Sequence, residues 1–357
     1  MNRFLAISFL VTVFLPKIAV GQDHLHEDAF LKIVSMHDAK EKYSFKEAVF
    51  AVENAYMEGE LDTLYLNMEI QGLTKLIENI VKSRKLLNYN HKDKEAVLKY
   101  ASLYSVMKDT IPIYMKGGQY EYQPYGYDFE DIWGEKDWRK MFVSKLLIEN
   151  KGNCHSLPYL YKILAEEIGV KAHLALAPNH IYIKHRNEKD GWYNTELTSG
   201  YFPIDAWIMA SGYVHLDGIR NGLYMKALND KESLALLLVD LAQGYHRKYP
   251  DNNGAFILRC LEKALQYYPN YINALLLKLE TEKRQLQAYV KSKHKTINEI
   301  IDDPKGKIAW VNLNTQVRNI HELGYRQMPK RMYLDWLVSL KEEKEKYLNK
   351  KIMTLKK

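Results

Sequence analysis

The sequence predicts an α+β protein in which a small antiparallel sheet lies between two helical regions. Apolar residues recur at helical spacing from about residue 27 to 104, and again from about residue 231 to the end. Between these regions, over residues 170–198, apolar and polar side chains alternate, which is typical of strands that bury one face. A helix that begins near Cys154 leads into the strands, so we expect this helix to pack on the sheet.

The first 21 residues have the pattern of a secretory signal peptide. Arg3 gives a positive start, the apolar stretch over residues 4–15 is short for a membrane span, and small residues occupy positions 19 and 21. An uncleaved membrane anchor is the alternative, but Pro16 interrupts the apolar run. We expect cleavage before Gln22, export to the periplasm or the cell exterior, and a mature chain without a membrane span.

Composition and charge narrow the class of protein. The chain has 357 residues, 47% of them hydrophobic, which is enough for a sizeable core and more than one domain. Its 51 basic and 44 acidic residues are interspersed, and a net charge of +7 without a concentrated basic patch argues against nucleic acid as a partner. We divide the mature chain into a helical region over residues 22–110, a core over residues 111–225 and a second helical region over residues 226–357.

Two segments next to these elements have less definite interpretations. His24 and His26 are metal-ligating residue types, but partner ligands are missing nearby, so we expect a disordered tail at the new N-terminus. The stretch over residues 111–129 is rich in Tyr, Gly and Pro, which predicts a loop. Its tyrosines either contact a ligand or cover the seam between the helical region and the core, and we prefer the second role.

Cys154 stands at the start of a predicted helix. Residues 135–150 have helical spacing, and Gly152 is expected to end that helix. A second helix follows, with Pro158 near its beginning and Gly169 just past its end. Backbone amides and the dipole at a helix N-terminus favour a thiolate, so this position predicts a lowered pKa for the Cys154 thiol.

The predicted strands place a histidine and an acid near each other. If the strands pair on either side of a five-residue loop over residues 186–190, His180 lies directly opposite Glu196, with Cβ atoms about 5 Å apart. A register that differs by two would put Asn194 opposite His180 instead. A thiol, an imidazole and a carboxylate form a candidate nucleophile, base and orienting group. Cys154, His180 and Glu196 are therefore the candidate catalytic residues, with Asn194 as the alternative orienting residue.

The chain has only two cysteines, and their state decides whether Cys154 is available for chemistry. A long-range disulfide between Cys154 and Cys260 would remove the nucleophile. We favour free thiols, because an exported protein stabilised by disulfides normally has more cysteines and Cys260 lies in an apolar helical pattern. A purely structural His180 is the other alternative to a thiol enzyme.

At these residues the chain resembles a known superfamily. The segment from about residue 128 to 203 is similar to the core of the transglutaminase-like superfamily of papain-type folds, and most to its short bacterial branch. The stretch over residues 151–170 resembles the nucleophile helix of that branch, and the stretch over residues 177–184 resembles its histidine strand. The spacing Trp192-x-x-x-Glu196-x-Thr198 resembles its acid strand, in which the acid is usually Asp.

The resemblance implies a nucleophile helix packed on a small antiparallel sheet, and a Cys-His-acid triad that acts on amide or ester carbonyls without a cofactor or metal. It also makes Tyr127, Asp128 and Trp192 candidate substrate-binding residues. Capping of the helix that follows is the alternative role for Asp128. The departure from the pattern is Glu196, whose side chain is one methylene longer than the usual Asp.

The C-terminal region resembles a tetratricopeptide repeat. Helices are predicted over residues 234–242 and 260–268, a turn separates them at residues 250–254, and a third helix starts near residue 273. One repeat unit is recognisable, whereas stacked repeats need about three for stability. We therefore expect helices packed on the core, with a surface that can contact a protein partner.

Two classes of function follow from the sequence. As an enzyme, the protein would be a peptidase, an amidase or a transglutaminase-like acyltransferase that acts on a peptide, a protein or a cell-wall-type amide. As a binding or scaffold protein, it would present the same cleft and helical flank to a partner without turnover.

Overall fold

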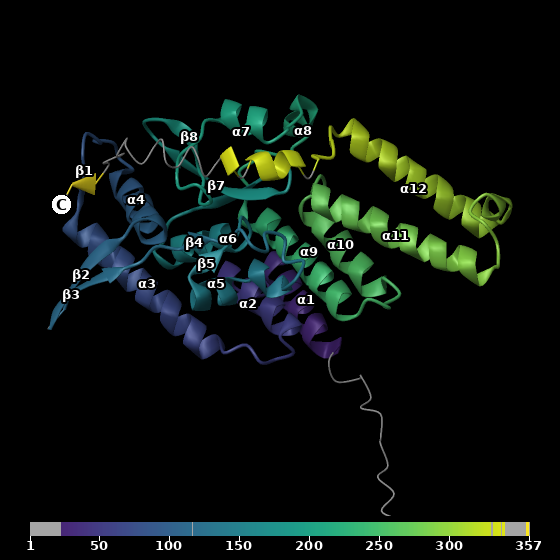
Figure 1. Cartoon of the computed structure of the whole chain (residues 1–357), viewed down its shortest axis with the longest axis horizontal. Helices are drawn as coiled ribbons and strands as arrows, with labels where there is room; N and C mark the ends of the chain where they lie inside the picture. The colour runs from purple at the N-terminus through teal and green to yellow at the C-terminus, as the bar shows by residue number, and fades with distance from the viewer. Residues whose placement is uncertain (1–22, 116, 330, 337, 340–354, 357) are drawn as a thin grey trace, which may run out of the picture.

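The computed structural model describes residues 23–356, except residues 116, 330, 337 and 340–354. The predicted signal peptide over residues 1–21 lies outside the described residues. Helices and small sheets are combined in one chain, so the α+β class is confirmed (Figure 1).

Helices make up most of the described chain. In chain order they are α1 (Asp23–His37), α2 (Phe45–Tyr56), α3 (Thr63–Ser83), α4 (Lys94–Lys108), the short 3-10 helix η2 (Trp138–Met141), α5 (Val143–Glu149), α6 (Ser156–Glu167), α7 (Asp205–Ser211), α8 (Leu216–Arg220), α9 (Asp230–Lys248), α10 (Ala255–Tyr267), α11 (Ile272–Ser292), the 3-10 helix η3 (Glu299–Asp302) and α12 (Pro304–Glu322).

The strands form small sheets. They are β1 (Lys85–Leu86), β2 (Ile111–Met115), β3 (Gly118–Tyr122), β4 (Gly126–Tyr127), β5 (Lys151–Gly152), β6 (His173–Ala177), β7 (His180–Asn187), β8 (Gly191–Thr195) and β9 (Leu355–Lys356). The sheet that carries the candidate site has the order β6-β7-β8 and is antiparallel throughout.

Helix α6 lies at the centre of the fold. It packs against α2, α3, α4 and α5 and also against β6 and β7 of the sheet, and Figure 1 shows these elements gathered around it. Every residue from Ser156 to Ala165 is buried, as expected for a helix covered on all sides. The chain immediately before α6 is therefore anchored to the main core.

The sheet has a different register from the predicted one. Asn187 pairs with Gly191 across a three-residue loop, and Ile183 pairs with Thr195, so the expected direct pairing of His180 with Glu196 is wrong by two positions. The loop is shorter because the Asn187 side chain accepts a hydrogen bond from the Asp190 N–H and closes a tight turn. Glu196 lies just beyond the end of β8.

The segment before Cys154 also differs from the prediction. The expected helix over residues 135–150 is split into η2 and α5 at Phe142. Asn150, with a φ of 55°, ends α5 in the left-handed conformation that we had assigned to glycine. Gly152 instead lies in β5, where an added Cβ would approach Ser156 Oγ to 2.6 Å.

The tyrosine-rich stretch over residues 111–129 is not the predicted loop. Strands β2 and β3 form a hairpin, and β4 pairs in parallel with β5. Gly117 and Gly118 both have positive φ values and supply the reversal between β2 and β3. The glycines that predict a loop therefore form a turn between two strands.

The expected N-terminal tail is wrong. Helix α1 begins at Asp23 and packs against α2 and α9. His26 is buried and meets the rings of Tyr245, Tyr249 and Phe256 edge-on. Aromatic packing on the C-terminal helices thus fixes a segment that had no visible partner in the sequence.

The C-terminal helices α9, α10 and α11 lie where the sequence predicts them. Helix α9 begins with a capping box formed by Asn229 and Glu232, and its apolar side packs against α1, α2 and α10. Among the described residues, no helix has the length and apolar character needed to cross a bilayer.

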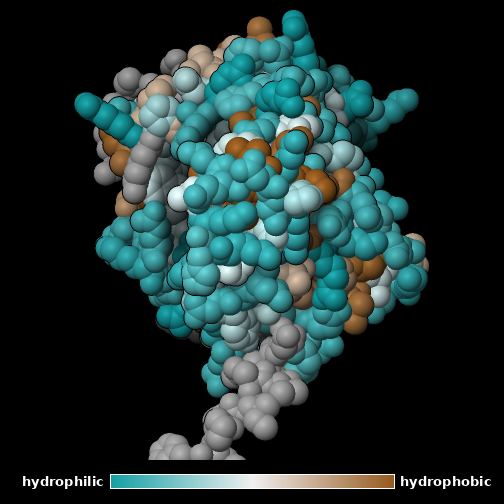
Figure 2. Space-filling model, turned by 90° about the vertical axis from the view of Figure 1, so that its right-hand side faces the viewer, coloured by the Kyte–Doolittle hydropathy of each residue, from teal (hydrophilic) through white to brown (hydrophobic). Residues whose placement is uncertain are grey.

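Helices α11 and α12 pack side by side at one end of the molecule. Figure 2 faces this end and shows apolar side chains scattered among polar ones. A groove of about 680 Å³ runs between the two helices and is lined by Leu286, Val290 and Leu313 together with lysines. After α12 the chain returns toward the sheet, and the helical residues 331–336 lie over β7 (Figure 1).

Candidate functional site

Cys154 lies in the turn immediately before α6. The helix begins at Ser156 rather than at Cys154 itself, because the Asn153 side chain accepts hydrogen bonds from the N–H groups of His155 and Ser156. The Cys154 side chain is 7% exposed. Its sulfur contacts the Asn179 carbonyl oxygen at 3.7 Å, in the turn that precedes His180.

His180 and Glu196 form a buried pair. The Nε2–H of His180 donates to Oε2 of Glu196 over 2.5 Å, and both residues are less than 5% exposed. A carboxylate acceptor places the ring proton on Nε2. The Nδ1 atom of the same ring is buried and makes no hydrogen bond within the described part of the chain, so it is the nitrogen free to exchange a proton.

The loop after β8 holds the Glu196 carboxylate in place. The Thr198 N–H donates to Oε1 of Glu196 over 2.7 Å, while the Glu196 N–H donates to the Tyr201 carbonyl. Burial raises the pKa of Glu196, but the charge of His180 and the hydrogen bonds that the carboxylate accepts from His180 and Thr198 outweigh burial and lower it. Glu196 is therefore ionised, and it accepts a hydrogen bond from the imidazole at a fixed position.

The thiol and the imidazole interact electrostatically. Burial raises the pKa of the Cys154 thiol, but the interaction with His180, the hydrogen bond with the Tyr333 hydroxyl and the charge of His155 together outweigh burial and lower it. Burial lowers the pKa of His180, whereas Glu196 and then Cys154 raise it to about 10. These opposite shifts favour a thiolate beside an imidazolium, which is the reactive form of a cysteine nucleophile.

Both cysteines are free. Cys154 and Cys260 are buried separately and form no disulfide, so the disulfide alternative is wrong. Burial raises the pKa of Cys260. The chain therefore holds one thiol with a lowered pKa and one inert thiol.

The other candidate residues lie in different surroundings. The Asn194 amide donates to the Pro203 carbonyl and to Asp205, so the structure does not bring it to His180 as an orienting residue. Asp128 is buried in an ion pair with Lys140 at 2.6 Å. Trp192 is half exposed, and its ring meets His173 edge-on.

Tyr127 lies closer to Cys154. It belongs to β4, which pairs with Gly152 two residues before Cys154. Burial and then the charge of Cys154 raise the pKa of the Tyr127 hydroxyl. Of the three candidate substrate-binding residues, Tyr127 is the one with a direct electrostatic interaction with the thiol.

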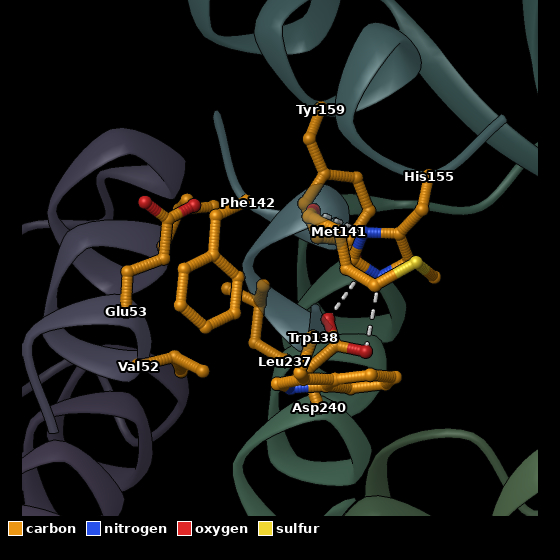
Figure 3. Close-up of a pocket in the computed structure, with 10 residues that line it drawn as sticks. Val52, Glu53, Trp138, Met141, Phe142, His155, Tyr159, Leu237 and Asp240 are labelled. Carbon is orange, nitrogen blue, oxygen red and sulfur yellow. Dashed lines mark hydrogen bonds and ion pairs between the residues drawn. The ribbon is translucent and has the colours of Figure 1, made fainter. Parts of the chain in front are cut away.

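His155 follows Cys154 in the sequence but belongs to a separate polar cluster. Its ring lies 2.9 Å from the Met141 carbonyl and 3.0 Å from the Asp240 carboxylate, and Tyr159 donates to the same carboxylate (Figure 3). The cluster borders a cavity of about 20 Å³, which has room for one water. Asp240 belongs to α9, so this cluster ties the nucleophile turn to the C-terminal helices.

Two residues of the site were not foreseen. The Tyr333 hydroxyl lies 3.4 Å from the Cys154 sulfur, and the Trp336 ring meets the His180 ring edge-on at 4.5 Å between centroids. Both come from the chain after α12, about 180 positions from Cys154. Neither a motif nor a spacing in the sequence indicates this contact.

Comparison with protein families, with curated proteins and with solved structures found no match. Among the described residues, no group of three or more His, Cys, Asp or Glu side chains is placed to hold a metal ion. The site is thus defined by its own geometry, as a thiol beside a buried imidazole and carboxylate.

Proposed function

We propose that the protein is an exported cysteine-dependent acyl-transfer enzyme with a transglutaminase-like, papain-type core. The observation that carries the proposal is the buried His180–Glu196 pair next to Cys154, with the pKa of the thiol lowered and that of the imidazole raised. A purely structural role for His180 would not require a neighbouring thiol with a lowered pKa, so this feature favours the catalytic role. The signal-like first 21 residues support export.

Each of the three residues has a distinct task in this reaction. The Cys154 thiolate attacks an amide carbonyl carbon, and the His180 imidazolium then protonates the departing amine through Nδ1. Glu196 keeps the ring in the required tautomer and balances its charge. The products of this half-reaction are a thioester on Cys154 and a free amine.

The carbonyl oxygen becomes negatively charged during the attack and needs a donor. The Cys154 N–H makes no hydrogen bond within the described residues and adjoins the sulfur, which supports a role as an oxyanion donor. Water or a second amine then attacks the thioester, with His180 as general base. Hydrolysis and transamidation share every step up to the thioester and differ only in the acceptor that attacks it. In both reactions the acyl donor is an amide, and we propose a peptide, a protein or a cell-wall-type amide as the substrate class.

The pH dependence of Cys154 alkylation by iodoacetamide tests this function. In the wild type we expect a midpoint well below pH 9, because the imidazolium stabilises the thiolate. His180→Ala and Glu196→Gln should move the midpoint upward, and each unit is about a tenfold loss of thiolate at neutral pH. Glu196→Asp keeps the charge and should retain part of the shift.

Cys260 serves as the internal control because burial raises its pKa. A Cys154 midpoint at or above pH 9 that neither variant moves would contradict the proposed chemistry. Electrophilic acyl-amide probes provide the second arm: they should label the wild type and not Cys154→Ala. Added primary amine would then distinguish transfer from hydrolysis by the product formed.

The second candidate function is protein binding, and the groove between α11 and α12 favours it. The groove is lined by apolar side chains and by Lys283, Lys291 and Lys295, a combination suited to an acidic amphipathic segment. If the Cys154 midpoint matches that of an ordinary thiol, binding without turnover becomes the better proposal.

A further inference from the structure

The chain after α12 forms a small hydrophobic cluster of its own on top of the site. Met328, Tyr333 and Trp336 are buried there and are separate from the main core. They pack on partly buried side chains of the core, namely Tyr127, Ile132, Trp133, Tyr201 and Trp207. Met328 and the helical residues 331–336 are therefore seated on an apolar surface beside Cys154.

Two aromatic side chains of this segment touch the catalytic candidates directly. The Tyr333 hydroxyl is 3.4 Å from the Cys154 sulfur, and Trp336 lies edge-on against the His180 ring. Tyr333 is 0% exposed. Residues 333 and 336 are three apart in a helical stretch, so one face of this helix covers both members of the pair.

The position of Tyr333 conflicts with substrate binding. A carbonyl carbon must come within about 3–3.5 Å of the attacking sulfur in a productive complex. The Tyr333 oxygen already occupies a point at that distance from the sulfur. Cys154 is 7% exposed and His180 is 4% exposed, so an acyl donor can reach the sulfur only after the side chains that cover it move.

Between the side chains of Tyr333 and Trp336, the described residues of the segment face outward. Met332 and Leu334 on the same stretch are exposed, and the Arg331–Asp335 ion pair is on the surface, where such pairs contribute little. A short helix held by a few buried side chains opens locally at a lower free energy than the core unfolds. The contact is thus of a kind that can be made and broken.

We propose that the helical residues 331–336 are a cover that blocks access to Cys154 and must move away before an acyl donor binds. This inference rests on the proposed function, because it regulates the same site. Tyr333 and Trp336 are the residues that hold the cover closed. The resting protein is accordingly a self-blocked enzyme.

The rate of Cys154 alkylation in full-length variants tests the cover. Trp336→Ala and the double variant Tyr333→Ala/Trp336→Ala should alkylate about tenfold faster than the wild type or more, because truncating a buried aromatic anchor favours the open state. Leu334→Ala is the matched control, since Leu334 lies on the same helix but is exposed; its rate should not change. Slow labelling of Cys260 in every variant shows that the core remains folded.

A synthetic peptide provides a second measurement that does not depend on the stability of the variants. A peptide of residues 326–339, added in excess to Trp336→Ala, should slow alkylation of Cys154 again. The same peptide with Ala at both aromatic positions should have no effect. Unchanged alkylation in Trp336→Ala with Cys260 still protected, or an intact peptide that gives no protection, would overturn the cover.

Failure of the cover and failure of the proposed chemistry give different results. Trp336→Ala is the variant for this comparison, because the Tyr333 hydroxyl itself lowers the pKa of Cys154 and its removal would shift the midpoint. Opening of a cover by Trp336→Ala multiplies the alkylation rate by the same factor at every pH at which the cover is unaffected. The chemistry, in contrast, sets the pH midpoint. A faster variant with an ordinary thiol midpoint would support the cover and reject the enzyme, whereas a low midpoint without acceleration would do the reverse.

Discussion

Gly152 lies where the turn before Cys154 packs closely against α5 and α6. An added Cβ would lie 2.6 Å from Ser156 Oγ and 2.8 Å from Leu146 Cδ1. Ser156 Oγ also accepts the Asn153 N–H, so the turn that holds Cys154 depends on this close approach. A side chain at position 152 would push α5 and α6 apart at the site.

We expect Gly152→Ala to lower the free energy of unfolding by about 1–3 kcal/mol through overpacking. Gly72→Ala is the matched control, because Gly72 is an exposed residue inside α3 with open space around its Cα. That change should raise the free energy of unfolding by about 0.5–1 kcal/mol. Urea denaturation measures both, and a stable Gly152→Ala protein would contradict the packing argument.

The sequence predicts the residues that come together at the site, but not the register of the strands that carry them. Cys154, His180 and Glu196 do converge, although the register that motivated the pairing is off by two. The longer side chain of Glu196 reaches the ring from beyond the end of β8. Residue spacing does not predict the conformation of the loop after β8, and this conformation directs the Glu196 side chain toward His180.

The hairpin between β6 and β7 is the element that delivers His180. Pro178 and Asn179 form its two-residue turn, and Asn179 has a φ of 57°. Its carbonyl contacts the Cys154 sulfur, so the turn relates the nucleophile to the histidine strand. The backbone at Asn179 must adopt the left-handed conformation for this to hold.

Asn179→Val should destabilise the hairpin by about 1–2 kcal/mol, because a β-branched residue resists positive φ. Asn179→Gly accepts the same conformation and should have little effect. The Asn179 side chain is exposed, so lost side-chain packing does not explain a difference between the two variants. Urea denaturation gives the free energies, and equal stability of both variants would contradict the argument.

Elements with strong periodicity were predictable, and those with local interruptions were not. The helices α6, α9, α10 and α11 lie where apolar spacing places them. The helix expected before Cys154 is split at Phe142, and the tyrosine-rich loop is a hairpin. In these two cases the chain follows hydrogen bonds and turn geometry that hydrophobic periodicity does not encode.

Across the whole molecule, a buried carboxylate connects the N-terminal helices to the site. Glu53 in α2 accepts hydrogen bonds from the N–H groups of Val143 and Ser144 at the start of α5. Burial raises its pKa to about 7 in spite of these bonds. The folded chain therefore retains a proton that the unfolded chain releases near pH 4.5.

A raised pKa in the folded state stabilises the protein at low pH, and this contribution is lost as pH rises through about 7. For Glu53 the loss between pH 4.5 and pH 8 amounts to about 3 kcal/mol. Urea denaturation as a function of pH, in the wild type and in Glu53→Gln, isolates this contribution. The difference between the two proteins should shrink or reverse as pH rises, and a difference that is constant over this range would reject the assignment.

The contact between Tyr333 and Cys154 is the feature of the site that could not be predicted from the sequence. Tyr333 reaches Cys154 through packing on Trp133, Tyr127 and their neighbours, which lie far away in the chain. The sequence around Tyr333 has the pattern of an ordinary amphipathic helix and contains no motif that indicates a contact with Cys154. Only the assembled core creates the apolar surface on which it lies.

The order of the chain gives this late contact a consequence during synthesis. Cys154, His180 and Glu196 emerge from the ribosome more than a hundred residues before Tyr333, which corresponds to roughly ten seconds at ordinary elongation rates. During that interval the Cys154 thiol lacks its contact with Tyr333 and is more accessible to oxidants. The contact between Tyr333 and Cys154 forms only after residue 333 has been made.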